Sequence, residues 1–258
     1  MVLRDGEVSV EVLMLRRSLA SEFVSGAYVF PGGAVDPADG EAEMLGRCTG
    51  RTDAEASAIL ELDFGGLAYW VSALRECFEE AGVLMAARAD GRPLTFEDPD
   101  VQARFVGHRR ALNGGEQSFD EICRTEELTL PADALHYVGH WITPEGPPRR
   151  YDTRFFAALA PSGQTAVHDE VETIDHMWVT PADALAQHHA GEIRLMYPTV
   201  WHLRLLAQCA TTAELVAWMS NLHTVSTIEP ELIIDDQGRR QVIVAVDPEE
   251  GADAGKRP

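Results

Sequence analysis

An α/β sandwich with a mixed sheet is the fold class that the sequence predicts. Segments in which apolar and polar residues alternate recur along the chain, and helix-like segments lie between them. One of these helices is charged on one face and apolar on the other. The chain holds no internal repeat and no linker, so we expect residues 1–246 to form a single domain. We expect the polar tail at 247–258 to be disordered.

The composition is that of a globular protein with an acidic surface. Of the 258 residues, 45% are hydrophobic, which is enough to bury a core. Acidic residues number 42 against 21 basic ones, giving a formal charge of −21. This balance argues against a nucleic-acid-binding surface, which needs clustered Lys and Arg. It leaves a phosphorylated small molecule open as a substrate, because a bound divalent cation can reverse the local field.

The sequence shows no pattern typical of membrane insertion or secretion. No apolar run approaches the ~20 residues that a membrane-spanning helix needs. Charged residues interrupt the first segment, so no signal peptide is predicted. The four cysteines are widely spaced and form no CxxC pair, which is typical of free thiols in a reducing compartment. We therefore expect a cytoplasmic protein that contacts no membrane.

The first predicted elements lead up to a glycine turn. Alternating residues at 8–16 predict a strand, and 27–30 predict a second, short strand. Pro31-Gly32-Gly33 ends that strand in a turn. The acidic segment that follows contains a short helix at about 53–62, and a stronger helix at 67–81 ends at Gly82.

The second half of the chain predicts a mixture of strands and helices. Residues 88–134 look like loops and short helices. Strands are then expected at 137–142, 154–159 and 171–179. Helices are expected at 181–189, 198–208 and 212–222. A last strand pair, at 231–235 and 241–246, flanks the turn Asp236-Gln237-Gly238.

The helix at 67–81 carries the candidate metal-binding residues. At about 100° per residue, Glu76, Glu79 and Glu80 lie on one face of the helix. Glu76 and Glu80 form a like-charge pair that costs about 0.2–0.5 kcal/mol, and only Arg75 can offer an ion pair, to Glu79. A solvated helix face would carry more balancing cations than this. Mg²⁺ and Mn²⁺ prefer carboxylate oxygen ligands, so the face predicts a metal site.

The same helix resembles one half of a known motif. The pattern Arg75-Glu76-x-x-Glu79-Glu80-x-Gly82 is similar to the second half of the Nudix box. The glycine turn from Phe30 to Asp36 resembles the segment that opens that box. Two departures stand out. Asp39 replaces the usual Glu six positions after the second glycine, and Arg75 follows 36 positions later instead of eight.

A box interrupted in this way resembles the branch of Nudix enzymes that includes peroxisomal coenzyme A diphosphatases. The resemblance implies a Nudix α/β/α sandwich with a mixed sheet and helical insertions at about 40–67 and 88–134. We expect the first insertion to fold beside the core without supplying metal ligands. A homodimer is compatible with the resemblance.

The resemblance also implies roles for individual residues. Glu76, Glu79 and Glu80, with the Gly33 carbonyl, would bind Mg²⁺ or Mn²⁺. Arg75 would orient the glutamates, and Glu76 would take a proton from the attacking water. Because many Nudix enzymes draw a further Glu from a late loop, Glu170 is a third catalytic candidate, with an ordinary loop carboxylate as the alternative.

Arginines stand out in so acidic a chain, because they suit bidentate phosphate contacts. Arg16 and Arg154 are the predicted substrate-binding residues, and surface ion pairs are the alternative for each. The expected reaction is hydrolysis of a diphosphate linkage in a small nucleotide-like substrate. Coenzyme A or an acyl-CoA is the leading candidate for that substrate. ADP-ribose, NADH and nucleotide sugars remain open. The rival from another class is a non-catalytic Nudix module that binds nucleotides, and such modules usually lose box glutamates.

Overall fold

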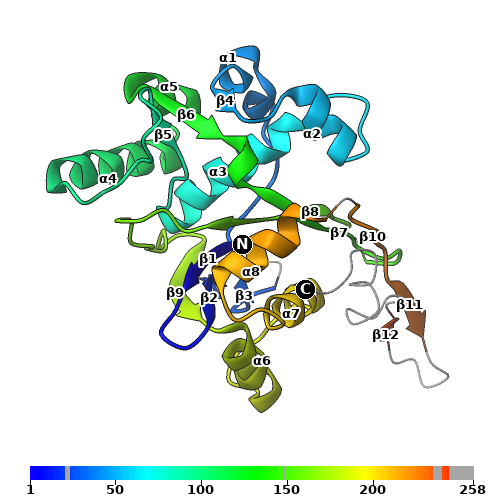
Figure 1. Cartoon of the computed structure of the whole chain (residues 1–258). Helices are drawn as coiled ribbons and strands as arrows, with labels where there is room; N and C mark the ends of the chain where they lie inside the picture. Colours follow the sequence, from blue (N-terminus) through cyan, green and yellow to red (C-terminus); the bar gives the residue numbers. More distant parts are fainter. Residues whose placement is uncertain (21–23, 148, 223, 235–239, 244–258) are drawn as a thin grey trace.

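A mixed sheet forms the middle layer of the fold, as the ribbon of the computed structural model in Figure 1 shows. The structure describes residues 1–20, 24–147, 149–222, 224–234 and 240–243. The strands run in the order β10-β7-β8-β1-β2-β3, and β9 pairs with β2. The pairs β1–β8 and β10–β7 are parallel and the others antiparallel. The strand bounds are β1 Val2–Asp5, β2 Val10–Arg17, β3 Tyr28–Val29, β7 His136–Ile142, β8 Asp152–Leu159, β9 Thr173–Val179 and β10 Thr227–Ile228.

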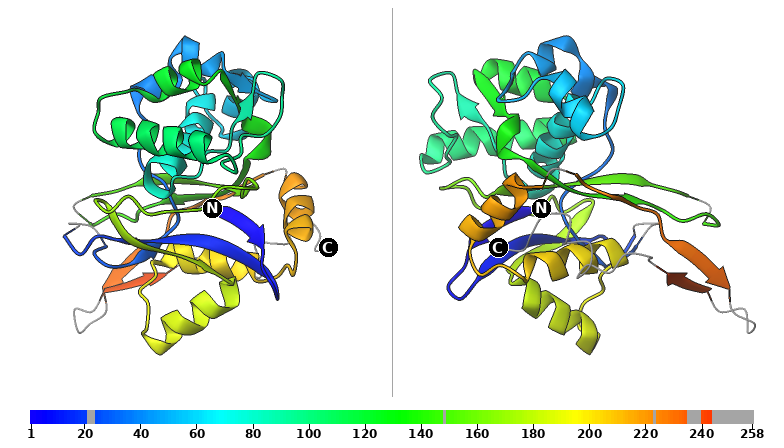
Figure 2. Two further views of the ribbon diagram at one scale, coloured as in Figure 1. Left: turned by 90° about the vertical axis from the view of Figure 1, so that its left-hand side faces the viewer. Right: turned by 45° about the vertical axis from the view of Figure 1, so that its right-hand side comes forward.

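Helices cover both faces of this sheet. Successive residues of a strand point to opposite faces, and in β2 Leu13 and Leu15 pack into a different core cluster from Val12 and Met14. Helix α3 (Leu67–Ala81) packs on the first face. Helices α6 (Pro181–Ala190), α7 (Tyr197–Leu206) and α8 (Thr212–Ser220) contribute to the second cluster, and α6 and α7 lie below the sheet in Figure 2. The α/β/α sandwich predicted from the sequence is therefore confirmed.

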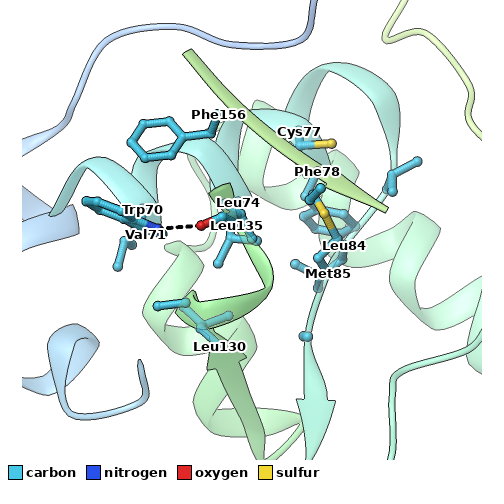
Figure 3. Close-up of a cluster of buried hydrophobic side chains, with 14 of the residues drawn as sticks. Trp70, Val71, Leu74, Cys77, Phe78, Leu84, Met85, Leu130, Leu135 and Phe156 are labelled. Atoms are coloured by element: carbon cyan, nitrogen blue, oxygen red, sulfur yellow. Dashed lines mark hydrogen bonds between the residues drawn. The ribbon is translucent and has the colours of Figure 1, made fainter. Parts of the chain in front are cut away.

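Helix α3 is fixed to the sheet by large apolar side chains. Trp70, Leu74 and Phe78 are fully buried, and they point into the cluster drawn in Figure 3. The Trp70 indole donates a hydrogen bond to the Leu135 carbonyl at 3.1 Å. Its ring meets that of Phe156, on β8, edge-on at a centroid distance of 4.7 Å. This packing sets the rotation of α3 and so directs its glutamates to the other side.

The two insertions fold together as one layer outside α3, which we call the insertion layer. Strand β4, from the first insertion, pairs with β6, from the second, and β5 completes a small sheet. Arg47 and Asp120 join the insertions through an ion pair of 2.7 Å. The short helix η1 (Pro37–Gly40) leads into the insertion layer. The elements of the layer are α1 Ala42–Leu45, β4 Cys48–Thr49, α2 Asp53–Ile59, β5 Ala87–Arg88, α4 Pro99–Asn113, α5 Phe119–Thr125, β6 Leu128–Pro131 and η2 Ala132–Ala134.

Some elements differ from the expectation. Strand β1 was not predicted, because it has only four residues; it pairs with β2, its neighbour in the sequence, and with the distant β8. The segment at 88–134 contains a long helix, α4, of 15 residues, not only short ones. Its apolar periodicity is weak because Phe105 is its one buried residue. The last strand pair forms as β11 (Glu231–Ile234) and β12 (Arg240–Ile243).

Two further expectations lie outside the described residues, namely the turn Asp236-Gln237-Gly238 and the tail at 247–258. Among the helices that the structure describes, none combines the length and apolar character required to cross a membrane.

The first insertion does more than lie beside the core, because it caps the amino-terminal end of α3. The helix begins after Gly66, which offers no side-chain cap. The Asp53 carboxylate accepts the backbone N–H groups of Gly65 and Leu67 at 3.0 and 2.9 Å. The Ser57 hydroxyl accepts the N–H of Gly66 at 2.9 Å. These contacts supply both the missing acceptors and a negative charge where the helix dipole favours one.

We predict that Asp53→Ala lowers the free energy of unfolding by about 1–2 kcal/mol, because the first N–H groups of α3 lose their acceptor. Urea unfolding of the metal-free protein measures the change. Asp63→Ala is the matched control, because Asp63 is exposed. If the two variants lose equal stability, Asp53 does not cap α3.

Candidate functional site

The glycine turn after β3 meets the charged face of α3. The Gly32 backbone N–H donates to Glu80 Oε2 at 2.9 Å, across 48 positions of sequence. A Cβ added at Gly33 would lie 2.6 Å from the carboxylate of Glu76, so any larger residue there would displace that carboxylate. The turn and the helix, separated by the first insertion, therefore form one site.

A single guanidinium joins the two halves of the interrupted box. Arg75 donates from Nε and Nη2 to the two carboxylate oxygens of Asp39, at 2.8 and 2.9 Å. Its Nη1 donates to Glu76 and Glu79 at 2.8 and 3.0 Å. Burial alone would lower the pKa of Arg75, but the hydrogen bonds and charges of these carboxylates raise it above its usual range. The predicted orienting role of Arg75 agrees with this geometry.

The shorter side chain at Asp39 still supports the turn. Asp39 is 2% exposed and lies on η1, the 3₁₀ helix that follows the glycine turn. Its carboxylate accepts the backbone N–H of Asp36 at 2.8 Å in addition to the two bonds from Arg75. The 3₁₀ helix brings Asp39 close enough to Arg75 that the extra methylene of Glu is not needed.

Burial raises the pKa of Glu76, Glu79 and Glu80 above the ordinary value for a glutamate. The negative charge of Glu172 adds to the effect in all three cases. The pKa of Glu80 rises furthest, to about 8, although a backbone hydrogen bond opposes the rise. Crowded carboxylates with shifted pKa values are typical of functional sites.

The carboxylates and the turn suit a divalent cation in donor type. Hard cations take carboxylate and carbonyl oxygens, and both kinds meet here. Within the described part of the chain, no three acidic, histidine or cysteine side chains are already gathered as a metal-binding group. The reason is visible in the hydrogen bonds, since Glu79 is turned toward Arg75 and Glu80 toward Gly32. A metal site at this face would require these side chains to rotate.

The late loop brings Glu172, and not Glu170, to the glutamate face. Glu172 raises the pKa of each box glutamate, and its carbonyl accepts the Ser18 N–H at 2.8 Å, which ties the loop to the end of β2. Both side chains are exposed, but Glu170 is not among the charges that act on the box glutamates, and its backbone is left-handed at φ 68°. Asp169 shapes the loop by accepting the N–H groups of Glu172 and Thr173 at 3.0 and 2.7 Å. An Asp three residues before Glu172 is the sequence signal that could have indicated this turn.

The predicted substrate arginines lie on different faces of the sheet. Arg16 adjoins Tyr28, which belongs to the core cluster on the α6 and α7 side, so its position does not support contact with the glutamates. Its neighbour Arg17 points to the opposite face, and its charge acts on Glu80. Arg154 lies over the ring of Tyr69 on α3, with 4.7 Å from Cζ to the ring centroid. Alternation along β2 could have favoured Arg17 over Arg16.

An open hollow of about 490 Å³ lies elsewhere, between β9 and α6. Trp178, Asp183 and Gln187 are among its lining residues, and none of the box glutamates is. The chemistry of the site is therefore set by the turn and α3, not by this hollow.

We predict that Asp39→Asn lowers the free energy of unfolding of the metal-free protein by roughly 3 kcal/mol, because it removes one partner of a buried ion pair. Asp36→Asn, at the N-cap of the same 3₁₀ helix, should change the free energy of unfolding little, since Asn also serves as an N-cap. Chemical denaturation of both variants measures the difference. Equal losses would mean that the Asp39–Arg75 pair is not what joins the two halves.

Comparison with known proteins agrees with this geometry. The family model described as the NUDT19 Nudix domain matches residues 48–206. The chain is 30% identical to the acyl-coenzyme A diphosphatase NUDT19 of Homo sapiens over 236 residues, which cover 79% of this chain and 62% of that protein. It is 28% identical to the protein of the same name from Gallus gallus over 250 residues, covering 84% and 66%. The chain thus spans less than two thirds of the length of these relatives.

A solved structure is similar as well. The crystal structure of a NUDIX hydrolase from Alicyclobacillus acidocaldarius superposes with a TM-score of 0.65 at 28% sequence identity. The match covers 87% of this chain and 94% of that one. Sequence, fold and the meeting of the glycine turn with α3 lead to the same assignment, and the chain belongs to the Nudix family with the NUDT19-type domain.

Proposed function

We propose that this protein hydrolyses a diphosphate linkage in a small nucleotide-like molecule. The observation that carries the proposal is the meeting of the α3 glutamate face with the Gly32-Gly33 turn, through Glu80 at Gly32 and Glu76 at Gly33. The relatives reported above are named as diphosphatases, which supports the same reaction class here. The proposal also fits the acidic composition, since a phosphorylated substrate then requires a cation at the site.

Glu76, Glu79, Glu80 and the Gly33 carbonyl are the proposed ligands for Mg²⁺ or Mn²⁺. When bound, such an ion would polarise the phosphoryl oxygens and lower the pKa of a coordinated water. The raised pKa values fit this assignment, because a cation would offset the repulsion that now disfavours the charged glutamates. Arg75 holds Glu76 and Glu79 in place and keeps the helix joined to the turn through Asp39.

The remaining charged residues divide between proton transfer and substrate binding. Glu76 and Glu172 are the proposed acceptors of the proton from the attacking water. Glu170 remains a weaker candidate for that role. Arg17 and Arg154 are the proposed contacts to substrate, because both lie on the α3 side of the sheet.

Coenzyme A or an acyl-CoA is the substrate that we propose first. It contains the required diphosphate, and the names printed for the relatives specify acyl-coenzyme A. ADP-ribose, NADH and nucleotide sugars offer the same linkage and are the alternatives. The non-catalytic alternative is disfavoured, because all three box glutamates are present on one face of α3.

Incubation with coenzyme A and Mg²⁺ or Mn²⁺ tests the proposal. We expect adenosine bisphosphate and phosphopantetheine, detected by mass spectrometry. Glu79→Gln should reduce turnover roughly 100-fold or more by removing a charge from the metal site. Near-full activity in that variant would contradict the metal assignment. A tenfold or greater preference for ADP-ribose or NADH in kcat/KM, about 1.4 kcal/mol, would replace coenzyme A and leave the reaction class intact.

The late loop gives a separate prediction with its own matched control. Glu172→Gln should lower kcat/KM roughly 100-fold, because a carboxylate beside the site is lost. Glu170→Gln removes the same charge two residues away and should keep nearly normal activity, since the charge of Glu170 is not among those that act on the box glutamates. Steady-state kinetics on the same substrate compare the two. The reverse order would return the late-loop role to Glu170.

A further inference from the structure

Helix α3 has no positively charged residue of its own at its carboxyl-terminal end. Its last turn contains Glu79 and Glu80 and no basic residue. The carbonyls at this end form the negative pole of the helix dipole, where a cation is favourable and carboxylates are not. The two glutamates of the site therefore stand at the end of the helix that disfavours them most.

The missing cation comes from the second insertion. On α4, Arg109 donates from Nε to the Glu79 carbonyl at 2.9 Å, and Asn113 donates to the same oxygen at 3.2 Å. A Cβ built on Gly82 would lie 3.0 Å from Arg109 Nη1, so the guanidinium lies directly against the end of the helix. Figure 1 shows α4 beside this end of α3.

Arg109 also acts on the late loop. Its charge interacts with Glu80 and with Asp169, the residue whose carboxylate accepts the Glu172 N–H at 3.0 Å. Asp169 further accepts the N–H and hydroxyl of Thr173, both at 2.7 Å. One side chain of the insertion layer thus contacts the end of α3 directly and acts through its charge on the loop that carries Glu172.

We propose that Arg109 is a positioning residue that holds the carboxyl-terminal end of α3 and the Asp169 turn in the arrangement that the site needs. The proposal rests on the proposed function and deepens it, because it assigns the second insertion a part in that site. Arg109 acts on the site through the helix, because its hydrogen bond goes to a backbone carbonyl of α3. Its Nη2 is buried, and it donates no hydrogen bond to any residue that the structure describes.

Three variants on one helix test the proposal. Arg109→Met removes the charge and keeps the aliphatic stem, and Arg109→Lys keeps the charge. Arg110→Met is the matched control, because Arg110 is the next residue along α4 and its side chain is exposed. We expect Arg109→Met to lower kcat/KM roughly 10- to 100-fold, through kcat and not through KM for the substrate. Arg109→Lys should recover part of this loss, and Arg110→Met should behave as the wild type.

A second readout does not depend on activity. Titration of the protein with Mn²⁺, followed by the electron paramagnetic resonance signal of the free ion, measures metal affinity directly. We expect weaker Mn²⁺ binding in Arg109→Met than in Arg110→Met. Asn113→Ala, which loses a bond to the same carbonyl without a change of charge, should shift affinity in the same direction by less. It keeps the test valid if Arg109→Met fails to fold.

The outcomes separate this inference from the proposed function. If the wild type cleaves none of the diphosphates offered, the proposed function fails, and the Mn²⁺ titrations still decide the role of Arg109. If Arg109→Met matches Arg110→Met in both kcat and Mn²⁺ affinity, Arg109 is not a positioning residue. If Arg109→Met loses thermal stability but keeps kcat and Mn²⁺ affinity, the role of Arg109 is only to cap the helix, and the proposal is wrong.

Discussion

The ion pair between Arg75 and Asp39 is the contact on which the rest of the site depends. Three carboxylates crowd one helix face, and this guanidinium is shared between two of them and the turn. The charge of Arg75 must reduce the repulsion between the glutamates enough to keep them close together. It must not neutralise them fully, because they would then no longer hold a cation. Asp39 takes two of the guanidinium hydrogen bonds, which leaves Glu76 and Glu79 with one each.

The insertion layer completes the helix that carries the glutamates. α3 begins without a side-chain cap, and its last turn holds two acidic residues and no basic one, so the Gly82 cap alone leaves the charge of the helix dipole unbalanced. Asp53 supplies a negative charge at one end, and Arg109 supplies a positive charge at the other. The layer therefore belongs to the machinery of the site, although it contributes none of the proposed metal ligands.

The sequence was sufficient to predict the parts of the fold that depend on local patterns. The period of apolar residues placed α3 at its observed bounds, and the spacing of Glu76, Glu79 and Glu80 predicted their common face. It was insufficient where the arrangement depends on distant partners. The choice between Glu170 and Glu172 depends on how the Asp169 turn meets β2, and α4 buries too little apolar surface to show a clear period. Arg109 could not be found, because its role is defined by a helix 30 positions earlier.

The pairing of Asp39 with Arg75 closes a loop of 36 positions, where an uninterrupted box closes one of eight. For a flexible chain, that extra length would cost only about 1.3 kcal/mol of closure entropy, since each doubling adds about 0.6 kcal/mol. Burial of Met44 and Leu60 in the main core can offset a cost of that size. Loop length was thus a weak barrier to interrupting the motif. Any interruption whose own residues pack against α3 would satisfy the same thermodynamic condition, so the length of the gap is free to differ among proteins that keep the same ion pair.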